Sequence, residues 1–175
     1  MWGTGVPFPR KSGSRLWKYC GNANTGGRMR LDRDFSEFIG LLRNHEVRFL
    51  VVGGYAVAAH GHPRYTGDLD VWVLVDPDNS ERLVHALDDF GFGSLGLTVA
   101  DFLTPNQVVQ LGYPPLRIDL HTSVDGVTFA ECYPRRLELR LGELAVPFIG
   151  LEDLRRNKAA SGRPQDVADL DALYG

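Results

Sequence analysis

The alternation of hydrophobic and polar positions predicts regular structure from about Asp34 onward. Apolar residues recur at helical spacing in residues 34–45, behind an acidic start, which indicates a helix. Short runs of apolar or alternating character predict strands. The expected helices cover residues 34–45, 54–61, 79–91, 128–135 (a short turn), 151–161 and 164–175. The expected strands cover 47–52, 68–75, 108–113 and 116–122, and a hairpin with its turn at Gly142 and Glu143 covers 136–150.

This order of elements predicts an α/β (α+β) fold. A mixed central β-sheet would be flanked by helices and followed by the C-terminal hairpin and two helices. Asn79 or Ser80 is expected to cap the helix at 79–91, and Gly91 to end it. The pattern between residues 92 and 107 is ambiguous.

The composition is that of a soluble globular protein. The 175 residues are 43% hydrophobic and 23% charged, which suits one domain with a full core. We find no apolar run near the roughly 20 residues of a membrane helix and no signal peptide. Cys20 and Cys132 are too few for a disulfide framework. These features predict a cytoplasmic protein with no membrane partner.

Charge is distributed unevenly along the chain. Residues 1–30 hold six of the 19 basic residues and none of the 22 acidic ones, so the remainder carries a net charge of −9. The basic segment is rich in Gly, Pro, Ser and Asn, which predicts a disordered tail. A single domain is expected at residues 31–175. Its acidic character makes nonspecific binding to nucleic-acid backbones unfavourable.

Three carboxylates follow the strand pattern. Asp68 and Asp70 lie on one face of their strand because side chains alternate, while Leu69 and Val71 lie on the other. Asp119 repeats this arrangement on the strand at 116–122, flanked by Arg117 and His121. Side-by-side oxygens suit Mg²⁺, with Mn²⁺ as an alternative. If the two strands are neighbours, three carboxylates converge and can hold two metal ions for an in-line displacement at phosphorus.

Other interpretations of these residues remain open. An Asp-x-Asp pair is often a strand end without metal, although the Gly53-Gly54 turn upstream could approach a triphosphate. His60 and His62, with His121 near Asp119, could instead form a transition-metal hydrolase site. The GxGxxG match at residues 91–96 follows a helix rather than a strand, so it does not indicate dinucleotide binding.

The stretch "VVGGYAVAAHGHPRYTGDLDV" (residues 51–71), with "RIDLH" later, resembles the signature of the nucleotidyltransferase superfamily that includes DNA polymerase β. The form is similar to that of small bacterial and archaeal members, including antibiotic nucleotidyltransferases and abortive-infection toxins. The tail "NKAASGRPQDVADLDAL" is similar to a helical segment of that branch. The resemblance implies the nucleotidyltransferase fold over about residues 34–173.

The resemblance also implies roles for individual residues. Gly53 and Gly54 would hold nucleotide phosphates. Asp68 and Asp70 would bind both metals, and Asp119 would bind the catalytic metal and help to deprotonate the acceptor hydroxyl. The implied reaction is transfer of NMP from an NTP to a hydroxyl-bearing acceptor, with release of pyrophosphate.

Basic and polar residues around this motif extend the candidate site. Arg64 could contact the triphosphate because guanidinium matches phosphate oxygens, or it could form a loop salt bridge. Thr66 lies beside it. Lys158 and, less strongly, Arg163 could line the cleft or remain solvated surface residues.

The acceptor is left open by the sequence: a small molecule, a tRNA end and a partner protein all fit. A catalytically inactive module, such as a toxin–antitoxin component with a cognate partner, is the alternative to an enzyme.

Overall fold

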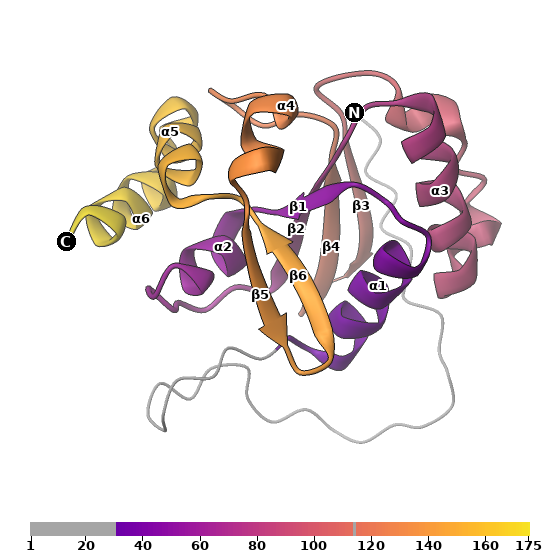
Figure 1. Cartoon of the computed structure of the whole chain (residues 1–175), viewed down its shortest axis with the longest axis horizontal. Helices are drawn as coiled ribbons and strands as arrows, with labels where there is room; N and C mark the ends of the chain where they lie inside the picture. Colours follow the sequence, from indigo (N-terminus) through magenta and orange to yellow (C-terminus); the bar gives the residue numbers. More distant parts are fainter. Residues whose placement is uncertain (1–30, 114) are drawn as a thin grey trace.

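The computed structural model describes residues 31–113 and 115–175. The basic segment 1–30 lies outside them, so both the disordered tail and the domain boundary at residue 31 stay predictions. Within the described residues, one mixed sheet forms the centre of the molecule. In Figure 1, α1 (Arg33–Asn44) and α3 (Pro77–Leu87) lie on one side of it, and α2 (Gly53–Ala59) lies on the other side with the C-terminal helices. The expected α/β fold is therefore confirmed.

The sheet has six strands in the order β3-β4-β2-β1-β6-β5. The pairs β2–β4 and β1–β6 are parallel, and the other three pairs are antiparallel. The hairpin predicted at residues 136–150 is the pair β5–β6. The strands are β1 (Phe49–Val51), β2 (Asp68–Val73), β3 (Val108–Tyr113), β4 (Leu116–His121), β5 (Leu137–Leu141) and β6 (Leu144–Phe148).

The remaining helices follow the predicted pattern closely. They are α4 (Phe129–Cys132), α5 (Leu151–Ser161) and α6 (Pro164–Tyr174), and short turns of other helix types cover Asp88–Phe92, Gly93–Leu95, Val99–Phe102 and Tyr133–Arg135.

Helix α1 shows why the periodicity was informative. The apolar side chains that form one face of this helix are buried: Phe35, Phe38, Ile39 and Leu42. Asp32 caps it by accepting a hydrogen bond from the amide of Asp34 at 2.8 Å.

The predicted start of α3 is wrong. Asp76 caps this helix through the amide of Asn79, and Pro77 occupies its first turn. Proline fits there because it has no amide hydrogen to satisfy. Asn79 is instead buried, where it accepts from the amide of Arg48 at 2.7 Å and donates to the carbonyl of Leu74 at 2.9 Å. Its polar side chain links β1 to the end of β2.

The predicted end of α3 is also displaced. The α-helix stops at Leu87, and the chain continues as a wider turn through Asp88–Phe92. Gly91 does break the helical path, with φ +106°. The added turn buries Phe90 and Phe92, which pack against each other with ring centroids 5.4 Å apart. Among the described helices, none is long and apolar enough to cross a membrane.

Candidate active site

The strands that carry the three carboxylates are neighbours, as expected. β2 and β4 pair in parallel register, with Asp70 opposite Asp119 and Asp68 opposite Arg117. The apolar residues between them, Leu69 on β2 and Ile118 on β4, are fully buried on the other face. Alternation therefore brings Asp68, Asp70 and Asp119 to one face of the sheet.

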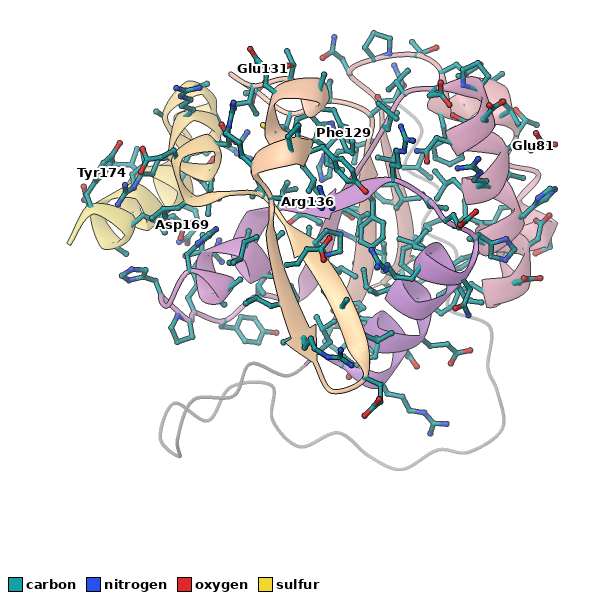
Figure 2. All side chains as sticks on the ribbon, in the orientation of Figure 1. Glu81, Phe129, Glu131, Arg136, Asp169 and Tyr174 are labelled. Carbon is teal, nitrogen blue, oxygen red and sulfur yellow. The ribbon has the colours of Figure 1, made fainter. Side chains whose placement is uncertain are left out.

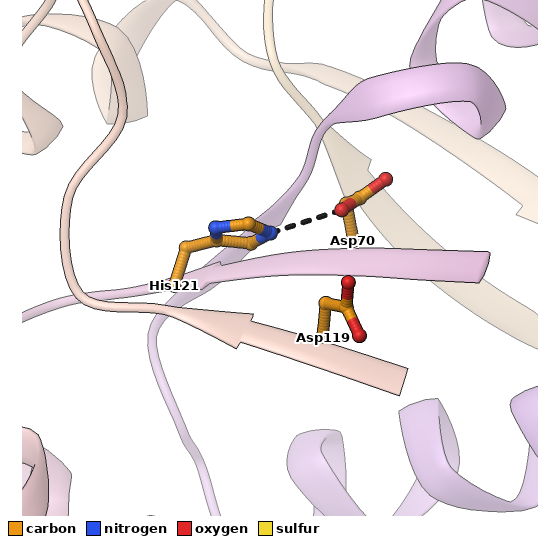
Figure 3. Close-up of side chains that lie close together, drawn as sticks. All are labelled: Asp70, Asp119 and His121. Atoms are coloured by element: carbon orange, nitrogen blue, oxygen red, sulfur yellow. Dashed lines mark hydrogen bonds and ion pairs between the residues drawn. The ribbon is translucent and has the colours of Figure 1, made fainter. Parts of the chain in front are cut away.

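Two basic side chains of β4 contact these carboxylates. Arg117 donates to Asp68 Oδ2 at 2.6 Å and to both carboxylate oxygens of Asp119, at 2.8 and 3.0 Å. His121 Nε2 lies 2.9 Å from Asp70 Oδ1, as Figure 3 shows. Arg117 thus occupies the space between Asp68 and Asp119, whereas Asp70 and Asp119 face each other without a guanidinium between them.

The donor atoms of Asp70, Asp119 and His121 can hold a metal ion. One ligand atom from each lies within 4.8 Å of the others (Figure 3). Two carboxylates and an imidazole suit a single divalent cation. A second ion between Asp68 and Asp119 would have to displace Arg117. Across residues 31–113 and 115–175 this is the one group of three such ligands.

The alternative hydrolase site at His60 and His62 is not formed. The ring of His60 is hydrogen-bonded through Nε2 to the carbonyl of Ile149 at 2.8 Å. Neither histidine belongs to the group of possible metal ligands found in the described part of the chain. Of the histidines considered from the sequence, His121 is the one beside carboxylates.

Crowding of negative charge marks this face of the sheet. The pKa of Asp68 is raised because burial disfavours its charged form, and the neighbouring charges of Asp119 and Asp70 add to this effect. Arg117 opposes the rise without cancelling it. With three carboxylates beside one guanidinium and one imidazole, the face carries more negative charge than its own basic side chains neutralise.

The Gly53-Gly54 turn lies directly against this face. Gly53 has φ +64°, and a Cβ on it would fall 2.1 Å from Asp70 Oδ2. A Cβ on Gly54 would meet the Thr66 side chain at 2.9 Å and Arg64 Nη1 at 3.1 Å. Both positions require glycine because any side chain would occupy the space between α2 and the start of β2. No side chain caps the first turn of α2, so its amides remain available.

A buried ion-pair network links this turn to the C-terminal helices. Arg64 donates to both oxygens of Asp169, at 2.6 and 2.9 Å. Lys158 lies between Asp166, at 2.5 Å, and Asp169, at 2.9 Å, and its side chain is only 5% exposed. The alternative of a solvated Lys158 is therefore wrong. The alternative of a salt bridge for Arg64 is observed, while Arg64 also lines the cleft.

The pKa values of this network move in the direction opposite to that of Asp68. Burial by itself would raise the pKa of Asp169, but hydrogen bonds from Arg64 and Lys158 lower it to about 2. The pKa of Asp166 is likewise lowered by Lys158 and Arg163, against the effect of burial. Figure 2 shows Asp169 on α6, on the side that faces α2.

A cleft of about 630 Å³ joins these parts. All the residues proposed from the sequence as catalytic or nucleotide-binding line it, and so do Arg117, His121, Arg163 and Asp166. Sequence reasoning noted Arg117 only as a neighbour of Asp119, and considered His121 as a metal ligand only together with His60 and His62. The two-residue spacing of Arg117 and His121 from Asp119 already placed them on its face of the strand. Asp166 and Asp169 were missed, although their three-residue spacing puts them on one face of α6.

The sequence matches, over residues 29–173, a family described as nucleotidyltransferases of unknown function (DUF6036). The chain belongs to this family. It is therefore a nucleotidyltransferase, and nucleoside monophosphate transfer is the activity that this assignment carries. No curated protein matches the chain.

Solved structures of low sequence identity share the fold. A Thermotoga maritima protein described as a nucleotidyltransferase (TM1012) is 13% identical, with a TM-score of 0.53 over 81% of this chain and 91% of its own. The lincosamide antibiotic adenylyltransferase LnuA, solved with lincomycin bound, is 12% identical, with a TM-score of 0.53 over 83% of this chain and 98% of its own. At these identities the likeness supports the nucleotidyltransferase fold.

Proposed function

We propose that this nucleotidyltransferase transfers NMP from an NTP to an acceptor hydroxyl with release of pyrophosphate, and that it depends on Mg²⁺ or Mn²⁺. The observation that carries the proposal is the pairing of Asp70 with Asp119 on adjacent parallel strands, beside a glycine turn in the same cleft. Carboxylates without enough positive charge to neutralise them fit a divalent cation.

Each group of residues has a distinct task in this proposal. Asp70 and Asp119 would hold the divalent ion, with Asp68 as a further ligand once Arg117 moves away. When bound, the ion supplies positive charge that polarises phosphate oxygens and acidifies the acceptor hydroxyl. Asp119, which lines the cleft, would accept the hydroxyl proton.

The phosphates would lie over the glycine turn. Because Gly53 and Gly54 have no side chain, their backbone lies directly against Asp70 and Thr66, and the uncapped amides of α2 can donate to phosphate oxygens. Arg64 presents Nη1, which also donates to the carbonyl of Tyr65, toward Gly54, while Asp169 accepts from Nε and Nη2. Lys158 would line the phosphate side of the cleft in a fixed position, because two carboxylates hold its ammonium group.

The test is the variant Asp119→Ala, assayed with an NTP, Mg²⁺ and, as acceptors, fractions of a cell extract and a set of amino sugars. We expect binding of NTP–Mg²⁺ within a few-fold of wild type and a loss of transfer by orders of magnitude, because the proton acceptor and one metal ligand are gone. Binding is measured with a fluorescent NTP analogue and transfer with α-labelled NTPs. Normal transfer by the purified variant would refute the role of Asp119.

A further inference from the structure

The order of strands divides the cleft into two sides. The strand order across this part of the sheet is β1-β2-β4-β3. The glycine turn follows β1, the carboxylates lie on β2 and β4 in the middle, and β3 is the edge strand. On β3, Gln110 lies opposite Asp119, with its amide nitrogen 3.4 Å from Asp119 Oδ2. If the phosphates lie over the glycine turn, the β3 side of Asp119 is left for the acceptor.

The β3 side is lined by uncharged groups and one carboxylate. Val108 lies opposite His121 in the ladder and is 49% exposed. Beyond it, the Ser123 hydroxyl accepts from the amide of Asn106 at 2.9 Å and donates to Asn106 Oδ1 at 2.7 Å. From α5, Asn157 reaches over to donate to the carbonyl of Asp125 at 3.0 Å. The surface thus offers amides, a hydroxyl, a valine and the exposed Asp125 carboxylate.

Positive charge in the cleft is already committed to carboxylates. Arg64 pairs with Asp169, and Lys158 pairs with both Asp166 and Asp169. Arg117 pairs with Asp68 and Asp119, and Arg163 pairs with Asp166. Among the described residues just named on the β3 side, none is lysine or arginine. Arg163 lies close enough to Asp125 for their charges to interact, but its guanidinium pairs with Asp166. A site that binds a nucleic-acid backbone carries basic side chains along the backbone path, so this side is unsuited to a polyanion.

We propose that the β3 side of the cleft binds the acceptor, and that the acceptor is a hydroxylated small molecule that is uncharged or carries an ammonium group. The proposal rests on the proposed nucleotidyl transfer. The acceptor's hydroxyl oxygen forms the new bond to the α-phosphorus of the NTP. The bond from that phosphorus to the bridging oxygen of the β-phosphate breaks, pyrophosphate leaves with the electron pair, and the hydroxyl proton passes to Asp119 and then to water.

The class of acceptor is tested by label transfer from α-labelled NTPs with Mg²⁺. The full-length protein is incubated with four fractions of a cell extract: total RNA, protein, anionic small molecules, and uncharged plus cationic small molecules. A set of amino sugars is tested in parallel. We expect label in the uncharged and cationic fraction or on an amino sugar. Label in RNA, in protein or in the anionic fraction overturns the proposal, and so does an absence of label in a protein that binds NTP and Mn²⁺.

The place of the acceptor is tested by Val108→Trp, which fills the β3 side. We expect the KM for the acceptor to rise at least tenfold, while NTP binding stays within twofold. Val167→Trp is the matched control, because Val167 is 50% exposed on α6 and lies outside the cleft lining. An unchanged KM in the Val108→Trp protein overturns the placement.

Failure of the proposed function itself would look different. It would show as a wild-type protein that binds neither NTP nor Mn²⁺, with binding of Mn²⁺ measured by electron paramagnetic resonance. The proposed acceptor site would then fall with it, whereas a protein that binds both and labels RNA refutes the acceptor class alone.

Discussion

Two groups of aspartates lie in or next to the same cleft, and their charges are neutralised to different extents. We call Asp68, Asp70 and Asp119 the sheet carboxylates, and Asp166 and Asp169 the helix carboxylates. The sheet carboxylates meet one guanidinium, that of Arg117, and one imidazole, that of His121. The helix carboxylates are fewer and meet Arg64, Lys158 and Arg163. The pKa of Asp68 is raised, chiefly by burial, whereas basic partners lower those of Asp166 and Asp169 against the effect of burial.

This difference separates the proposed cation site from a set of carboxylates that basic side chains of the protein already neutralise. Burial acts on both groups, so it does not explain the opposite directions of the pKa shifts. The decisive quantity is the number of basic groups within hydrogen-bond distance of each carboxylate. The sheet carboxylates keep an excess of negative charge that a divalent ion can neutralise, while the helix carboxylates fasten α5 and α6 to Arg64.

The largest expected effect is on catalysis, in the variant Asp70→Asn. Asparagine keeps the volume but removes the charge that would hold the metal, so we expect transfer to fall by orders of magnitude. Circular dichroism should show an unchanged fold. The control is Asp78→Asn, an exposed aspartate in the first turn of α3, which should transfer normally. Wild-type turnover by the Asp70→Asn protein would end the metal assignment.

The second effect is on stability, in the variant Asp169→Asn. Asp169 is 2% exposed, and its loss leaves Arg64 and Lys158 short of a partner in a buried setting. Removing one member of a buried ion pair costs about 3 kcal/mol or more of unfolding free energy. Urea denaturation measures this change.

The matched control for this variant is Asp153→Asn. Asp153 is equally buried, but the side chain of its partner Arg135 is 53% exposed and returns to water. We therefore expect a smaller loss, about 1 kcal/mol. Equal losses in the two variants would mean that the helix carboxylates are not a special network.

The sequence predicted the placement of the sheet carboxylates better than that of the helix carboxylates. Strand alternation is local, so Asp68 and Asp70 could be assigned to one face without the fold. That Asp119 would lie opposite Asp70 needed the strand order, which a family resemblance suggested and periodicity could not supply. The partners of Lys158 depend on how α5 and α6 cross and on the loop at Arg64, more than ninety residues earlier in the chain. Contacts of this kind are set by packing, which a pattern of apolar positions does not encode.

Local rules failed where two signals competed. Asn79 and Ser80 resemble a helix cap, yet Asp76 followed by Pro77 starts α3 three residues earlier. The proline fixes the first turn, and Asn79 makes three hydrogen bonds to the main chain, two just before β1 and one just after β2. Asn79 therefore makes tertiary contacts with the main chain and does not cap α3.

The stability of the protein should fall in acid as the helix carboxylates become protonated. The pKa of Asp169 is about 2 in the folded protein, below its value of 3.8 in the unfolded chain. The folded state therefore binds this proton less tightly, and the stabilisation is present above pH 4 and lost as the pH falls toward 2. For this one group the loss is on the order of 2 kcal/mol. Denaturation of wild type between pH 5 and 2 should show it, and Asp169→Asn should show a flatter profile.

The smallest expected effect is that of the variant Asp68→Asn, and it is a gain of stability where Asp169→Asn gives a loss. The raised pKa of Asp68 means that its charged form costs stability at neutral pH, since the folded state holds the proton more tightly than the unfolded chain does. With no divalent ion, we expect the variant to be slightly more stable than wild type, by at most about 1 kcal/mol, because Asp68 is partly exposed and solvent screens the repulsion.

Millimolar Mn²⁺ should reverse the order of stability of the two proteins, because an ion bound only by the folded state stabilises wild type more than a protein that lacks one ligand. Thermal denaturation with EDTA and with Mn²⁺ measures both halves. A variant less stable than wild type in EDTA would show that the ion pair between Arg117 and Asp68 outweighs the repulsion, and that the sheet carboxylates are as well neutralised as those of the helices.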